Sequence, residues 1–245
     1  MELYFLSRED EGNYFYEKNQ LTKPTARSKA YDLATLDDLS LLAKKVITKS
    51  SALRDNVNRV TDRLTSKNPQ VITLSTLREM MKPLAPEGSL DEFEMEGLAT
   101  VAATFYDLLA RVRPEIGRLK ESERRVVRKQ LIVDSAVMMH GYASLMREFN
   151  DAITTKGLKK AASDWSGKLE CLSSGRRYTF AQWSGDLFEK RNPLWQQIGV
   201  VKPGRDGRNL TVLNTGAARS ECGRILRRLV STSGRPQALH YLTIR

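Results

Sequence analysis

The sequence has few of the residues that build metal sites and disulfide frameworks. Its 245 residues include only two cysteines, Cys171 and Cys222, and only two histidines, His140 and His240. No CxxC pair occurs and no histidine is clustered with a cysteine, which argues against both a zinc site and a disulfide framework. We therefore expect no metal and no cofactor.

Long apolar runs are missing as well. No run approaches the roughly 20 apolar residues that a membrane-spanning helix requires. The N-terminal residues, MELYFLSRED, lack the basic start and the long apolar middle of a secretory signal. We expect a cytoplasmic protein that does not bind a membrane.

Catalytic motifs are absent too. The chain contains no G-x-x-x-x-G-K-S/T phosphate loop, no G-x-S-x-G nucleophile elbow and no H-E-x-x-H zinc pair. The Gly-rich stretch 202–208 is explained more simply by a hairpin with basic tips than by a loop that cradles a phosphate. Asp134 and His140 fall within one long predicted helix, where a separation of six positions points them to opposite sides. The sequence therefore offers no catalytic residue and favours a protein that is not an enzyme.

Positive charge is confined to one end of the chain. The net charge is +11, yet residues 1–155 hold 23 Lys/Arg and 23 Asp/Glu, which cancel. Residues 156–245 hold 17 Lys/Arg against 6 Asp/Glu and so carry the whole excess. A bias limited to one region indicates a surface that faces a polyanion. Nucleic acid is the expected polyanion.

Hydrophobic periodicity is helical over most of the chain and predicts a mainly α fold. Apolar residues recur at the three- and four-residue spacing of helices that bury one face. We predict a multi-helix bundle with a small basic hairpin or loop excursion near the C-terminus. The chain divides into an N-terminal extension (1–34), a charge-neutral helical core (35–155) and a basic C-terminal helical region (156–245). The last two are compatible with a single domain.

Capping residues and helix breakers set the predicted boundaries. The segment 19–30 is predicted to be a loop, and the longest helix is predicted from Ser122 to Asn150. Four further helices are predicted in the neutral region. They begin at Thr35, at Ser50 or Ser51 (burying Leu53, Val57, Val60 and Leu64), at Ser75 after an extended Val71–Leu74, and at a capping box of Ser89 and Glu92. In the basic region, helices are predicted to begin at Lys156 (with Leu158, Trp165 and Leu169 inward), at Thr179 (bearing Phe180, Trp183, Leu187 and Phe188) and at Asn214-Thr215.

The segment 190–229 combines three features at the basic end. Asn192-Pro193 predicts a rigid turn in front of Trp195, a large apolar anchor, and 200–213 predicts a Gly/Arg-rich hairpin. The last helix, read at about 100° per residue, places its apolar residues on one arc and its arginines on the opposite arc. The buried arc holds Ala218, Cys222, Ile225, Leu226 and Leu229; the outer arc holds Arg219, Arg224, Arg227 and Arg228, with Gly216, Ser220 and Gly223 in its middle.

Glycine inside a helix costs about 1 kcal/mol relative to alanine, so glycines on an outer face suggest that a phosphate chain or another backbone approaches closely. We predict duplex DNA as the partner. The alternative is a protein-interaction module that docks an acidic partner, and an oligomer is compatible with either. RNA is disfavoured because exposed aromatic residues are scarce. The predicted DNA-binding residues are Arg176, Arg177, Lys190, Arg191, Arg205, Arg208, Arg219, Gly223, Arg224, Arg227 and Arg228.

Several short motifs follow one another in an order that resembles a known family. They are Phe15, Asn19 and Lys23-Pro24; Leu74-Ser75-Thr76-Leu77; Phe105-Tyr106-Asp107-Leu108-Leu109; Arg128, Ile132 and His140-Gly141; Trp183 and Arg191-Asn192-Pro193-x-Trp195; and Asn214-Thr215. With them the chain resembles the C-terminal, helical part of the DndB-type DNA sulfur modification proteins, also called DGQHR-domain proteins. The resemblance implies a part in DNA phosphorothioate modification, as a DNA-binding regulator or as an accessory of the modification complex.

The chain departs from that family in one respect. The hallmark sequence Asp-Gly-Gln-His-Arg is absent, and too few residues precede residue 15 to form the N-terminal domain that carries it. We expect either the C-terminal part of a longer protein or a divergent relative without that half.

Overall fold

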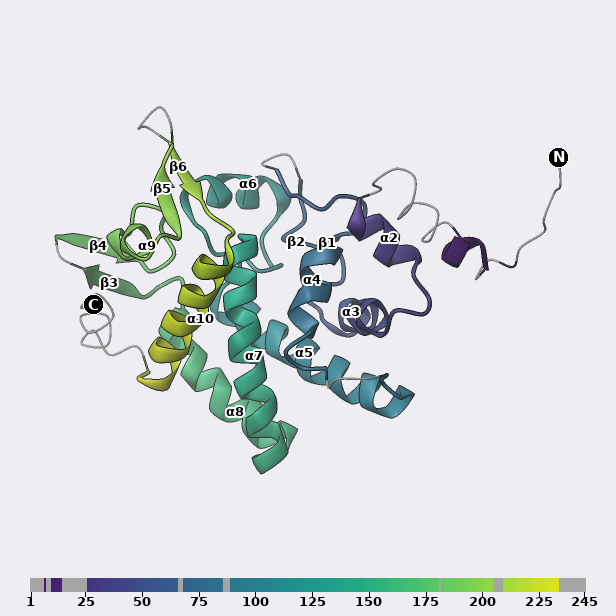
Figure 1. Ribbon diagram of the computed structural model, residues 1–245. Coiled ribbons are helices and arrows are strands. Elements are labelled where there is room, and N and C mark those ends of the chain that lie inside the picture. The colour runs from purple at the N-terminus through teal and green to yellow at the C-terminus, as the bar shows by residue number, and fades with distance from the viewer. Residues whose placement is uncertain are drawn as a thin grey trace.

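The computed structural model describes residues 7, 10–14, 26–65, 68–85, 89–180, 182–204 and 209–233, and there the protein is mainly α-helical, as predicted (Figure 1). Short strands pair two by two between the helices. The helices are α2 (Arg27–Leu33), α3 (Asp38–Lys49), α4 (Leu74–Met81), α5 (Glu92–Val112), α6 (Glu121–Gln130), α7 (Ala136–Lys156), α8 (Leu158–Leu169), the 3-10 helix η1 (Glu170–Leu172), α9 (Pro193–Gln197) and α10 (Gly216–Ser231). The strands are β1 (Val57–Asn58) parallel to β2 (Ile72–Thr73), β3 (Arg177–Phe180) antiparallel to β4 (Trp183–Asp186), and β5 (Val201–Pro203) antiparallel to β6 (Leu210–Val212).

Helices α5 and α7 form the centre of the bundle. Helix α7 packs against α4, α5, α8 and α10, and Figure 1 shows α7 and α10 side by side. Phe105 of α5, Phe149 of α7 and Trp165 of α8 meet in one aromatic cluster, with ring centroids 5.6–6.2 Å apart. A continuous hydrophobic cluster reaches from Leu42 to Val230. The neutral and basic regions therefore share one core.

Several helix starts lie one or two residues from the predicted ones. Asp37 caps α3, and Asp91 with Glu94 forms the capping box of α5. The predicted short helix after the extended residues Ile72 and Thr73 is α4, and Thr215 caps α10 as predicted. Segment 27–33, part of which was predicted to be loop, is helix α2.

The predicted helix from Ser122 to Asn150 is wrong, because the chain leaves the helical path between α6 and α7. Leu131 forms a β-bridge with Glu189, and the backbone N–H of Ile132 donates to the carbonyl of Phe188 at 2.9 Å. Ser135 then caps a new helix. Asp134 therefore lies in a break and not on a helix with His140, so the prediction that the two point to opposite sides no longer holds.

Two further helix predictions are wrong. Residues 51–64 form turns and strand β1, and Val60 is 63% exposed where a buried stripe was predicted. Residues 177–180 and 183–186 form the paired strands β3 and β4, and in β3 Tyr178 and Phe180 are buried whereas Arg177 and Thr179 are exposed. This alternation has the two-residue period of a strand with one buried face. On α8, Trp165 is buried as predicted whereas Leu158 is 36% exposed.

The segment before α10 follows the prediction closely. The Asn192 side chain caps α9, and Pro193 occupies the first turn. Trp195 is fully buried and its Nε1 donates to the carbonyl of Leu187 at 2.6 Å. Strands β5 and β6 pair antiparallel within the segment 200–213. Its predicted basic residues Arg205 and Arg208 lie outside the described residues.

Candidate nucleic-acid interface

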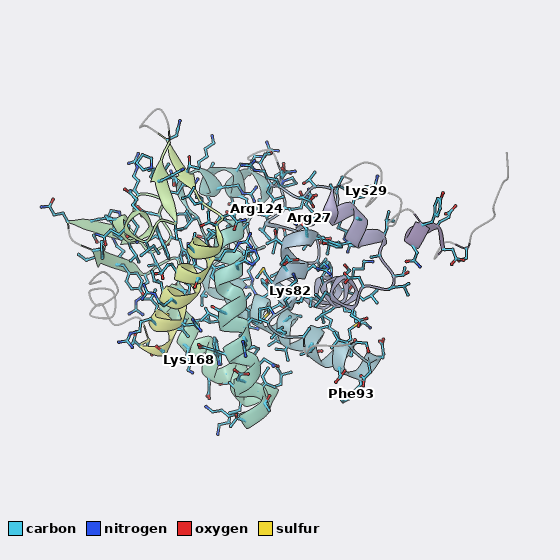
Figure 2. The ribbon with its side chains drawn as sticks, viewed as in Figure 1. Arg27, Lys29, Lys82, Phe93, Arg124 and Lys168 are labelled. Carbon is cyan, nitrogen blue, oxygen red and sulfur yellow. The ribbon has the colours of Figure 1, made fainter. Side chains whose placement is uncertain are left out.

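Two connected hollows lie along one side of α7. The larger, which we call the α7 cavity, has a volume of about 840 Å³ and is bounded by α2, the starts of α4, α7 and α10, the α6–α7 break and β6. The smaller, which we call the α7–α10 groove, has a volume of about 480 Å³ and lies between those helices beside the end of α4. Glu79, His140 and Arg219 line both. The two hollows therefore adjoin each other, and Figure 2 shows Arg27 near one end of α4 and Lys82 near the other.

Helix starts contribute positive potential to the α7 cavity. Thr73 caps α4 and Ser135 caps α7, and each side chain accepts a hydrogen bond from a first-turn N–H group. Ala136 and Val137, the first residues of α7, line the cavity, and their N–H groups have no hydrogen-bond acceptor among the described residues. Unpaired N–H groups at a helix start attract anions, because the helix dipole adds to their partial charge.

Arg128 of α6 closes one wall of the cavity. Its guanidinium donates to the carboxylate of Asp134 at 2.7 Å and to the carbonyl oxygens of Asn68 and Gln70 at 2.9 and 2.6 Å. Burial raises the pKa of the Asp134 carboxyl, and the charge of Arg128 opposes that rise. The ion pair between Arg128 and Asp134 neutralises both charges, and the hydrogen bonds of Arg128 hold the α6–α7 break against residues 68–70.

Lys190 lies on the same wall. Its Nζ donates to the carbonyl of Arg128 at 2.7 Å, and burial lowers the pKa of its ammonium group. The ammonium group forms no ion pair with a carboxylate in the described part of the chain. A half-buried cation of this kind is stabilised by an anion that enters the cavity.

His140 stands where the α7 cavity joins the α7–α10 groove. Burial, with a further contribution from the charge of Arg219, lowers the pKa of its imidazole from 6.5 to about 4. The ring is therefore neutral at pH 7, so it can both donate and accept a hydrogen bond.

The arginines of α10 differ in how far they are free to bind a ligand. Arg227 and Arg228 are exposed, and neither forms an ion pair with a described carboxylate. Arg219 donates to Oδ1 of Asn214 at 2.9 Å and lines both hollows. Arg224 is instead paired with Glu221 at 2.7 Å. Residues Ala218, Cys222, Ile225, Leu226 and Leu229 are buried, as the helix angles predict.

The predicted exposure of Gly223 is wrong. Gly223 is buried, and a Cβ at this position would lie 2.9 Å from the Ser144 Oγ of α7. Gly141 of α7 is equally close to α10, because its Cβ would lie 3.2 Å from Cβ of Cys222. These two glycines let the helices approach each other, and Gly223 also lines the α7–α10 groove.

Comparison with known proteins decides the family. The model of the DndB family, described as DNA-sulfur modification-associated, matches residues 7–216. The chain belongs to the DndB family. None of the curated proteins and none of the solved structures compared with it matches. Among its described helices, none is long and apolar enough to span a membrane.

The fold of this DndB-family protein brings only some of the predicted site residues together. Lys190 and Arg219 line the α7 cavity, and Arg219 and Arg227 line the α7–α10 groove. Gly223 also lines the α7–α10 groove. Among the other described residues of the predicted site, five line neither hollow. Arg176, over the Tyr178 ring at 5.5 Å, precedes β3; Arg177 in β3 donates to the carbonyl of Ser184; Arg191 is exposed beside the α9 cap; and Arg224 and Arg228 lie on α10.

Sequence reasoning missed the contribution of the neutral region to this DndB-family surface. Arg27, Arg63 and Arg128 line the α7 cavity, and Arg147 of α7 lines the α7–α10 groove. Counting charge by segment hid these residues, because carboxylates elsewhere in 1–155 balance them. One usable signal was Ser135, a capping residue directly before the apolar start of α7.

Proposed function

We propose that this DndB-family protein binds duplex DNA within a DNA sulfur modification system, as a regulator or as an accessory of the modification proteins. The phosphates bind the face formed by Arg147 of α7 and Arg219, Arg227 and Arg228 of α10. One observation carries the proposal: these four guanidinium groups form no ion pair with the described carboxylates.

Several cations of the neutral region differ in this respect. Lys45, Lys49, Arg59, Arg78 and Arg113 each form an ion pair with a carboxylate. Their charge is compensated within the fold. The α7–α10 face keeps its positive potential, which favours binding to phosphates through release of their counterions.

The dimensions of the face suit a DNA backbone. At about 1.5 Å of rise per residue, Arg219 and Arg228 lie roughly 14 Å apart along α10. A duplex presents one charge per about 1.7 Å of axis, so several phosphates fall within that distance. Ser144 and Ser220 add hydroxyl groups to the α7–α10 groove, and Figure 2 shows Lys82 and Lys168 on either side of α7.

The remaining predicted residues are secondary phosphate contacts in this proposal. They are Arg176 before β3, Arg177 of β3, Arg191 before α9, Arg205 and Arg208. Arg224 contributes less because Glu221 neutralises it.

A charge-matched pair of variants tests the proposal. One protein carries Arg147→Gln, Arg227→Gln and Arg228→Gln. The control carries Arg111→Gln, Lys159→Gln and Lys160→Gln, which remove three cations from α5 and α8 that form no ion pair with a described carboxylate. Fluorescence anisotropy measures the affinity of each for labelled duplex DNA. We expect the first variant to bind at least roughly tenfold more weakly and the control to change affinity by less than about threefold. Equal losses in both would show that only net charge matters and would overturn the assigned face.

An acidic protein partner is the competing function of the same cations. Unlabelled duplex and poly-glutamate at equal charge concentration separate the two in a competition assay. The proposal requires the duplex to displace labelled DNA at lower concentration than poly-glutamate. The reverse order favours the acidic partner.

A further inference from the structure

The α7 cavity carries positive charge that the fold leaves uncompensated. Its carboxylates are already engaged: Asp62 accepts from the backbone N–H groups of Arg27 and Ser28, and Asp134 is paired with Arg128. Its third carboxylate, Glu79, is paired with Arg78 and Lys82. Three cations that line the cavity, Arg63, Lys190 and Arg219, form no ion pair with a carboxylate in the described ranges.

Two of these cations share the cavity with the start of α7. Lys190 donates to the carbonyl of Arg128, whose guanidinium pairs with Asp134 directly before the capping Ser135, and Arg219 lines the cavity together with His140, one turn into the helix. Ala136 and Val137, whose N–H groups have no acceptor among the described residues, line the same cavity. Cations and unpaired N–H groups that line one cavity form a binding position for a doubly charged oxyanion such as a phosphate.

Another part of the cavity wall is apolar. Half-buried side chains of Tyr31, Leu64, Leu131, Val212 and Leu213 line it. A free phosphate ion would leave this surface in contact with water, whereas a ligand with a flat apolar ring would cover it. The volume of about 840 Å³ falls within the range of about 300–1,000 Å³ that is typical of small-molecule sites.

We propose that the α7 cavity binds a nucleotide, with its phosphate at the start of α7 between Lys190 and Arg219 and its ring against the apolar wall. The nucleotide is either a free mononucleotide or an unpaired unit of a DNA strand, since both offer the same chemistry. The two proposals share Arg219, but Lys190 belongs only to the cavity site, and Arg147, Arg227 and Arg228 belong only to the duplex-binding face and lie outside the α7 cavity.

Calorimetry on the full chain tests the proposal with defined probes. The probes are thymidine 5′-monophosphate, thymidine, inorganic phosphate and a 5′-phosphorylated tetrathymidylate. We expect the mononucleotide to bind at least about tenfold more tightly than thymidine or phosphate alone, because only the mononucleotide fills both parts of the cavity. Failure of the mononucleotide and the tetranucleotide to bind at millimolar concentration would overturn the proposal. If inorganic phosphate binds as tightly as the mononucleotide, the proposed contact between the ring and the apolar wall is wrong.

Variants assign the site. Lys190→Gln keeps an amide donor for the carbonyl of Arg128 but removes the charge, and Arg219→Gln removes the second cation. Each is expected to weaken mononucleotide binding at least about fivefold with an unchanged melting temperature. The matched control, Arg228→Gln, removes a cation from the same helix outside the cavity and is expected to leave the affinity unchanged. If Arg228→Gln weakens mononucleotide binding equally, the nucleotide is attracted by the net charge of the protein and not by a site in the α7 cavity.

Competition identifies the source of the nucleotide. If the tetranucleotide displaces the mononucleotide, the cavity accepts a unit of a DNA strand. If the mononucleotide binds and the tetranucleotide does not displace it, the ligand is a free nucleotide. The affinity for duplex DNA is measured on the same variants. If Lys190→Gln loses nucleotide binding but binds duplex DNA normally, the two sites are separate. Either proposal can therefore fail without the other.

Discussion

Gly141 of α7 lies directly against Cys222 of α10, where a Cβ on the glycine would come within 3.2 Å of Cβ of Cys222 and within 2.9 Å of a methyl carbon of Leu226. We expect Gly141→Ala to destabilise the protein by about 1–3 kcal/mol, because overpacking outweighs the gain of about 1 kcal/mol in helix propensity. Urea denaturation measures the change.

The control for this variant is Gly97→Ala in α5, where an added Cβ meets nothing within 4 Å. We expect that substitution to stabilise the protein by up to about 1 kcal/mol. Equal stabilisation by both substitutions would show that α7 and α10 are not held at this close distance.

Trp195 anchors the segment between the β3–β4 hairpin and α10. Its ring stacks on Phe188 with centroids 6.3 Å apart, and its Nε1 donates to Leu187. We expect Trp195→Ala to cost about 3–5 kcal/mol in free energy of unfolding. Trp195→Phe should cost less than half of that, because the Nδ2 of Asn192 still donates to the Leu187 carbonyl. An unchanged melting temperature in Trp195→Ala would contradict the burial of this ring.

Arg113 joins α5 to the β3–β4 hairpin inside the core. It is fully buried, its two terminal nitrogens pair with Glu115 at 2.8 Å and Asp186 at 2.6 Å, and its guanidinium lies over the Phe188 ring at 4.8 Å. Arg113→Met leaves two carboxylates without their partner, so we expect a loss of about 3–5 kcal/mol. Thermal denaturation compares it with Arg111→Met on the exposed face of α5, which should change stability by less than about 0.5 kcal/mol.

His140 makes stability depend on pH. Its pKa is about 4 in the fold against 6.5 ordinarily, so the unfolded chain binds the proton more tightly. The contribution of the neutral His140 ring to the free energy of unfolding is complete above pH 6.5 and is lost as the pH falls toward 4. The loss is at most about 3 kcal/mol, and less because the ring is partly exposed. Urea denaturation at pH 7.5 and 5 should show a smaller difference for His140→Gln than for the parent. An equal difference would contradict the burial of a neutral imidazole.

The sequence predicts the long helices well because their apolar stripes are long. Ala218, Cys222, Ile225, Leu226 and Leu229 recur over about three turns of α10, and only a helix buries all five together. Short segments contain too few apolar repeats to distinguish a helix from a strand. Phe180, Trp183, Leu187 and Phe188 fit helical spacing, yet the hairpin is fixed by distant contacts: the Tyr178 hydroxyl donates to the carbonyl of Cys171, and Asp186 pairs with Arg113.

The α6–α7 break and the α7 cavity escape sequence reasoning for the same reason. Ile132 and Val133 are apolar and continue a helical stripe, but the carbonyl of Phe188, more than fifty residues later, accepts the N–H of Ile132. The cavity then gathers side chains from Arg27 to Arg219. Local spacing carries no information about such an assembly, whereas the arginine face of α10 follows from local spacing alone.

Salt dependence of duplex binding tests the central claim most directly. Log affinity is plotted against log salt concentration for the parent and for the Arg147→Gln, Arg227→Gln, Arg228→Gln variant. If these three side chains contact phosphates, the slope flattens by about 0.9 for each lost contact, roughly 2.7 in total. The charge-matched control on α5 and α8 keeps the slope of the parent. A parent slope near zero, or an unchanged slope in the variant, would contradict phosphate binding by the α7–α10 face.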